Sequence, residues 1–112
     1  MKAEILSVDF APDDLYPQVP FTAALVRRLP GTDRPDYWLA QLAHPLAFAH
    51  DGKPRVIRWV VLASRLAGQS IQPSVGRMSV GLAYVVDDAQ VELETLDMRK
   101  CRYVAVAEAV IT

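Results

Sequence analysis

The alternation of apolar and polar side chains predicts a series of short β-strands. It is most regular over Met78–Val86, where large side chains occupy the even positions and small ones the odd positions, as in a half-buried strand. The small side includes Gly81 and Ala83, which indicates that a neighbouring sheet, subunit or ligand packs very close to it. Similar patterns predict further strands over residues 2–10, 21–29, 91–96 and 102–110.

Two segments are compatible with either a strand or a helix. Asp36–Ala49 reads as a strand with one apolar face, or as a short helix that Asp36 caps and Pro45 ends. Arg55–Ser64 is rich in β-branched residues and apolar on both faces, so we expect a strand, with a helix reaching Gly68 as the alternative. We expect strands in both places. The Asp-Gly pair at 51–52, between the two apolar runs, is typical of a tight hairpin.

Turn and loop signals divide the chain into pieces of strand length. Ala11–Pro20 holds three prolines and reads as a loop, while Pro30-Gly31, the polar segment Gly68–Gly76 and residues 87–90 read as turns or loops. Six or seven short strands separated in this way predict an all-β fold, either an antiparallel barrel or a sandwich, with at most one short helix. The 112 residues are expected to form a single β domain, residues 1–112, that buries about two-thirds of its surface.

The composition indicates the cellular compartment and limits the classes of partner that we expect. The net charge is −1, which disfavours nucleic-acid binding, and the apolar runs are too short to span a membrane. The single cysteine, Cys101, forms no intramolecular disulfide, and the first residues lack the pattern of a secretory signal. We therefore expect a soluble, cytoplasmic protein.

The charges are distributed unevenly along the chain. Residues 52–86 contain no acid but five bases: Lys53, Arg55, Arg58, Arg65 and Arg77. Pairing with the more acidic flanking segments across neighbouring strands is one explanation. The other is a patch that faces an anion or a protein partner.

Residues suited to catalysis or to metal binding are few. The chain has no clustered Cys/His set, so we expect no metal site and no cofactor, and it lacks the glycine-rich motifs that bind nucleotides. His44 is expected to pack in an apolar strand, and His50 to lie solvated at a hairpin tip. We assign no catalytic residue, which favours a non-enzymatic protein and leaves the question of an enzyme open.

Arginine and large aromatic residues in the middle of the chain suggest a protein interface. Both types are enriched at interface centres, because they bury a large area and keep a polar group. The candidates flank or belong to the doubly apolar strand and the strand before it: Tyr37, Trp38, Arg58, Trp59, Arg65 and Arg77.

Two features favour a homodimer. A strand that is apolar on both faces must be covered twice, either inside the fold or by another subunit, and for so small a chain we expect a second subunit to supply part of the cover. Enclosure of Val56, Val60 and Val61 within one subunit would remove this argument. The last strand, Tyr103–Ile111, has Glu108 as its one charged residue, so it would invite pairing if it lay at a sheet edge.

The leading hypothesis is a non-enzymatic, cytoplasmic β-domain that acts through protein–protein contact and self-associates. The alternative is a protein or small enzyme that binds an anionic small molecule at a barrel mouth through Arg58, Arg65 or Arg77. Single-stranded nucleic-acid binding through Arg55, Arg58 and Trp59 ranks third.

Overall fold

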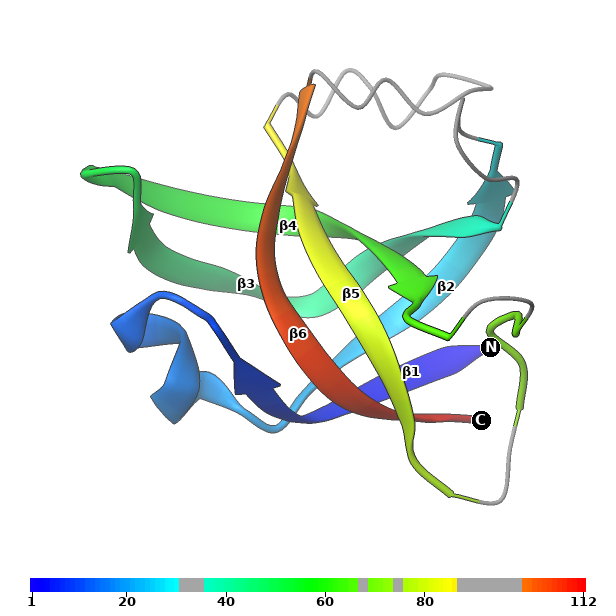
Figure 1. The fold of residues 1–112 in the computed structure, drawn as a ribbon. Helices are drawn as coiled ribbons and strands as arrows, with labels where there is room; N and C mark the ends of the chain where they lie inside the picture. Colours follow the sequence, from blue (N-terminus) through cyan, green and yellow to red (C-terminus); the bar gives the residue numbers. More distant parts are fainter. Residues whose placement is uncertain (31–35, 67–68, 74–75, 87–99) are drawn as a thin grey trace.

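The computed structural model describes residues 1–30, 36–66, 69–73, 76–86 and 100–112, and its six strands close into an antiparallel β-barrel (Figure 1). Each strand pairs with the next one along the chain, and the last strand returns to pair with the first. The all-β, antiparallel prediction is confirmed, with a barrel in place of a sandwich. The expected strand over residues 91–96 lies outside the described residues. The strands are β1 (Lys2–Asp9), β2 (Phe21–Leu29), β3 (Tyr37–His50), β4 (Lys53–Ser64), β5 (Met78–Val85) and β6 (Cys101–Ile111).

Both ambiguous segments are strands, and they form a long hairpin. Asp51 and Gly52 have φ angles of 52° and 73°, the two positive values that a type I′ turn requires. Beyond Leu42, β3 has no pairing with β2, and β4 pairs with β5 from Val60 onward. The hairpin therefore projects past the neighbouring strands at one end of the barrel (Figure 1).

A short 3₁₀ helix, η1 (Asp13–Gln18), lies in the segment that we expected to be a loop, and it packs on the projecting part of β3. The Gln18 side-chain amide donates to the Ala47 carbonyl at 2.7 Å and accepts from the Ala47 N–H at 3.5 Å. Asp14 Oδ2 accepts from the Ala49 N–H at 2.9 Å. These two side chains satisfy β3 backbone groups that lie beyond the reach of β2.

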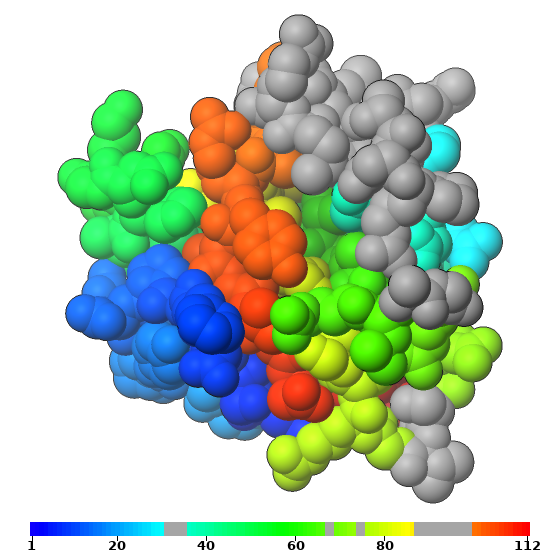
Figure 2. All heavy atoms as spheres, viewed as in Figure 1, coloured from blue at the N-terminus to red at the C-terminus, as the bar shows by residue number. Residues whose placement is uncertain are grey.

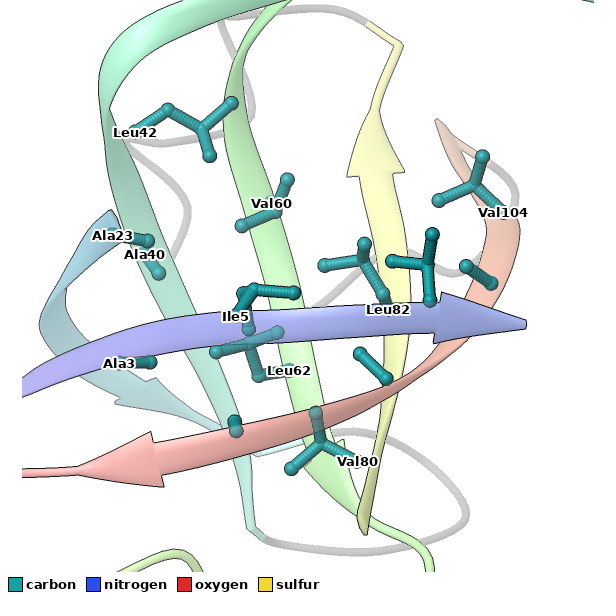
Figure 3. Close-up of a cluster of buried hydrophobic side chains, with 14 of the residues drawn as sticks. Ala3, Ile5, Ala23, Ala40, Leu42, Val60, Leu62, Val80, Leu82 and Val104 are labelled. Atoms are coloured by element: carbon teal, nitrogen blue, oxygen red, sulfur yellow. The ribbon is translucent and has the colours of Figure 1, made fainter. Parts of the chain in front are cut away.

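The barrel interior is filled by aliphatic side chains from every strand, as Figure 3 shows for Ile5, Val60, Leu62 and Leu82. Several interior positions are alanines, which allow opposite walls of a narrow barrel to approach closely. These alanines are Ala3, Ala23, Ala40, Ala105, Ala107 and Ala109.

A second apolar cluster lies on the outer side of strands β2 to β6. Its buried members are Leu29, Tyr37, Leu39, Val61, Ala83, Val85 and Cys101. Along β4, Val60 faces the interior and Val61 belongs to this outer cluster, so both faces of the apolar run are sheltered within a single chain. Val60 and Val61 therefore need no second subunit to cover them, whereas Val56 remains 64% exposed and is not enclosed.

Closure of the barrel also places β6 away from any edge. It pairs with β1 along one side and with β5 along the other. The prediction that the last strand offers an open edge to a second copy depended on an open sheet, and that condition does not hold.

Four strands contain extra residues at register shifts, which are Leu6 on β1, Val26 on β2 and further residues on β3 and β6. On β3, four residues lie between the paired Gln41 and Leu46, whereas Arg58 alone separates their partners on β4. His44 is in this bulge and is exposed, so the expected packing role for it is wrong. On β6, Val104 is the extra residue between two pairs, Leu82↔Ala105 and Ala83↔Tyr103.

Candidate functional site

The end of the barrel from which the hairpin projects carries the most exposed apolar side chains of the described chain. Phe10 is 86% exposed, Val56 64% and Tyr103 61%, and each lines a hollow at this end. Large exposed apolar side chains gathered in one place mark interaction sites more often than scattered ones do. The two hollows lie on either side of the hairpin, and they are described in turn.

The first, which we call the aromatic hollow, lies between the hairpin tip, β6 and the segment that follows β1. Its volume is about 380 Å³. In Figure 2 the hairpin is green, the segment after β1 is blue and β6 is orange, and the three meet around this region. The lining residues are Phe10, Ala11, Pro12, Ala49, His50, Asp51, Tyr103, Val104 and Ala105.

Phe10 protrudes beside the aromatic hollow in an unusual backbone conformation. Its φ is 52°, in the left-handed region, which costs a bulky residue about 1–2 kcal/mol. Its ring recovers little of this by packing, because the side chain is almost fully exposed. Strained backbone of this kind is concentrated at functional sites, where the side chain has a use outside the fold.

Tyr103 forms the opposite side of the aromatic hollow and also lies over Gly81. A Cβ atom at Gly81 would overlap the Tyr103 hydroxyl and would be 3.0 Å from its Cζ. The close neighbour expected for the Gly81/Ala83 side is therefore a side chain of the adjacent strand. Sequence reasoning missed Tyr103, because its contact with Gly81 depends on the β5–β6 register.

Three aromatic side chains, Phe48, His50 and Tyr84, pack together between the two hollows. A hydrogen bond of 2.8 Å joins His50 Nδ1 to the Tyr84 hydroxyl, and both rings meet Phe48 edge-on. Asp51 Oδ2 lies 3.9 Å from the same imidazole nitrogen. His50 is thus a packed, hydrogen-bonded residue, and the expectation of a solvated turn histidine is wrong.

The second hollow, which we call the arginine hollow, opens where β4 separates from β5. It has a volume of about 420 Å³ and is lined by Pro54, Arg55, Val56, Ile57, Tyr84, Val85 and Val86. The Arg55 guanidinium lies 6.0 Å from the centre of the Tyr84 ring, within cation–π range. Arg55 Nε is buried and has no hydrogen-bond acceptor among the residues that the structure describes.

The three aromatic candidates from the sequence lie away from both hollows. Tyr37 is buried in the outer cluster, and Trp59 is half-buried against that cluster. Trp38 packs against the interior core, with the Arg28 guanidinium 5.9 Å from its ring centre. All three side chains pack against other residues of the same chain.

The three arginine candidates are all exposed, and none of them lines either hollow. Arg65 directly follows β4, and Arg77 directly precedes β5. These two strand ends are adjacent, because the Arg65 N–H donates a hydrogen bond to the Ser79 carbonyl. Arg58 is seven residues from Arg65 along the strand, a distance of about 23 Å. The arginine that does line a hollow is Arg55.

The described residues contain no group of three or more His, Cys, Asp or Glu side chains that could hold a metal ion. Among them, no helix is long and apolar enough to cross a membrane. Comparison with known proteins found no matching family model, no matching curated protein and no matching solved structure.

Proposed function

We propose that this chain is a non-enzymatic, cytoplasmic β-barrel that acts through protein–protein contact and that its partner is a second copy of itself. The proposed interface is the face around the aromatic hollow, with Phe10 and Tyr103 at its centre. The observation that carries the proposal is a strained, exposed phenylalanine beside a hollow that it does not fill.

The shape of this face suits a symmetric dimer. In a two-fold interface the same patch serves both copies, so it must carry a projection and a matching depression. Phe10 supplies the projection, and the hollow bounded by Tyr103 and His50 supplies the depression. In the proposed dimer each Phe10 ring enters the hollow of the other copy.

The charges around the hollow are also self-complementary. Exposed acids lie on the side of β1 and η1, at Asp9 and Asp13, whereas the side of β4 and β6 carries two exposed bases, Lys53 and Arg102, beside one exposed acid, Asp51. A two-fold rotation brings the acidic side of one copy to the basic side of the other. Such pairing at a rim mainly sets orientation and association rate.

This proposal keeps the self-association inferred from the sequence but changes its basis. Within one chain, Val61 of the apolar strand β4 is buried in the outer cluster. Both edges of the final strand, β6, pair with neighbouring strands. The argument now depends on side chains that the fold leaves outside, above all Phe10.

Sedimentation equilibrium over a wide concentration range tests the proposal. We expect the native chain to dimerise at micromolar concentration and Phe10→Ala to be monomeric under the same conditions. Truncating a central aromatic costs about 2 kcal/mol per copy, and the two copies together weaken the dimer about 1,000-fold.

The matched control is Val26→Ala, because Val26 is a half-exposed apolar residue on β2 that lines neither hollow. This variant should dimerise as the native chain does. A native chain that stays monomeric at high micromolar concentration would exclude the proposal, as would a Phe10→Ala variant that dimerises normally.

A further inference from the structure

We infer that the arginine hollow binds the carboxylate group of a small molecule with an apolar body. This site is separate from the proposed dimer interface, because it lies on the other side of the hairpin and shares no lining residue with the aromatic hollow. Arg55 and the backbone N–H of Val56 are the proposed donors.

Arg55 is prepared for an anion that the described chain does not supply. Its guanidinium is held over the Tyr84 ring, and its Nε lies buried without an acceptor. No described acid forms an ion pair with it, in agreement with the absence of acids from residues 52–86. A buried donor without an acceptor is costly, so a carboxylate that binds the guanidinium and draws Nε toward the hollow would remove an existing penalty.

The second donor follows from the hydrogen-bond pattern of the hairpin. In a two-residue hairpin His50 and Lys53 form a hydrogen-bonded pair, and such pairs alternate along the strands. Ala47 and Ala49 therefore point their backbone groups away from β4, as their bonds to η1 show. By the same alternation, the N–H of Val56 points away from β3, toward the arginine hollow.

That N–H has no strand partner among the described residues. Pairing between β4 and β5 starts at Val60, four residues further along β4. The preceding Pro54 has no N–H, so Val56 is the first residue of β4 whose N–H points outward at this edge.

The walls favour a carboxylate over a phosphate. One guanidinium presents a planar fork that matches a carboxylate, whereas a phosphate dianion calls for more donors. Val56, Ile57 and Val85 offer apolar contact to the body of the ligand.

Titration of the ¹⁵N-labelled chain with benzoate, followed by amide chemical shifts, tests this inference. We expect a Kd of about 1 mM, with the largest shift change at the Val56 amide. Benzamide has the same ring without the charge and should cause no comparable change. Inorganic phosphate should bind at least about tenfold more weakly than benzoate.

The decisive comparison is between Arg55→Gln and Arg58→Gln, which remove the same charge from positions three residues apart. We expect Arg55→Gln to weaken benzoate binding at least about tenfold and the exposed Arg58→Gln to leave it unchanged. Arg55→Lys keeps the positive charge but lacks the planar pair of N–H donors, so it should bind benzoate more weakly than the native chain. This variant replaces Arg55→Gln in the comparison if Arg55→Gln does not fold.

The inference is overturned by equal affinities in the Arg55 and Arg58 variants, by equal binding of benzamide, or by no response to benzoate. Repeating the titration with Phe10→Ala separates it from the proposed dimer. Benzoate binding should persist in that variant, whether or not the native chain self-associates.

Discussion

Replacing Gly81 by alanine should destabilise the barrel only while Tyr103 is present. The alanine Cβ would lie 3.0 Å from Tyr103 Cζ and 3.1 Å from Cε2, closer than the 3.5–4.0 Å of ordinary carbon contacts, and it would overlap the hydroxyl. The tyrosine is largely exposed, so we expect its ring to swing away from the sheet and the backbone to stay in place.

The expected cost follows from the surface that the ring loses. With 61% of Tyr103 exposed, about two-fifths of the residue is buried, or roughly 80 Å² for an aromatic side chain. At about 25 cal/mol per Å², releasing this area costs about 2 kcal/mol. Alanine is favoured over glycine inside a strand by about 0.5–1 kcal/mol, so the net loss in the free energy of unfolding is about 1 kcal/mol.

A double-mutant cycle measured by urea unfolding, with tryptophan fluorescence as the signal, gives the coupling directly. In a Tyr103→Ala background, Gly81→Ala should become stabilising by about 0.5–1 kcal/mol, so the coupling energy is about 2 kcal/mol. The control is Gly76→Ala, since a Cβ at Gly76 would have no atom of the described part of the chain within 4 Å. If Gly81→Ala costs the same with and without Tyr103, the packing of this ring on Gly81 is wrong.

Two further predictions concern the hairpin end of the barrel. Phe10→Gly should raise the free energy of unfolding by about 0.5–1 kcal/mol, because relief of the left-handed backbone strain outweighs the added flexibility of glycine. Sedimentation of the same variant should show loss of the dimer. A destabilised variant would refute the assignment of strain. Gln18→Met should cost about 1–2 kcal/mol and speed hydrogen exchange of the Ala47 amide, whereas Gln41→Met, at an exposed position on β3, should do neither. Unchanged exchange at Ala47 would show that Gln18 does not cover this edge.

The strands were predictable because their signals are local. Alternation along Met78–Val86 and the Asp-Gly turn depend on neighbouring residues alone, and the turn type also fixes the register of β3 and β4. The same local information predicted that something packs tightly on Gly81, but it did not identify Tyr103.

The features that the sequence did not reveal depend on closure of the sheet. Whether β6 lies at an edge is decided by its pairing with β1, at the other end of the chain. Likewise, the Gln18 side chain substitutes for a strand partner of Ala47, 29 residues away. One local signal was available for the bulge in β3, since a proline inside a strand, here Pro45, is typical of such irregularities.

The candidate site was missed for a related reason. Tyr37, Trp38 and Trp59 have the composition of an interface, but the fold uses them for its own packing. Phe10 looked like the end of an ordinary strand, and its exposure follows from a backbone angle that no pattern of apolar residues encodes.

The most direct measurement of the proposed self-association is an isotope-filtered NOE experiment on a mixture of labelled and unlabelled chains. We predict contacts between the Phe10 ring of one copy and Tyr103 and Ala49 of the other. A dimer whose intermolecular contacts all arise elsewhere, with Phe10 still exposed, would contradict the proposed interface.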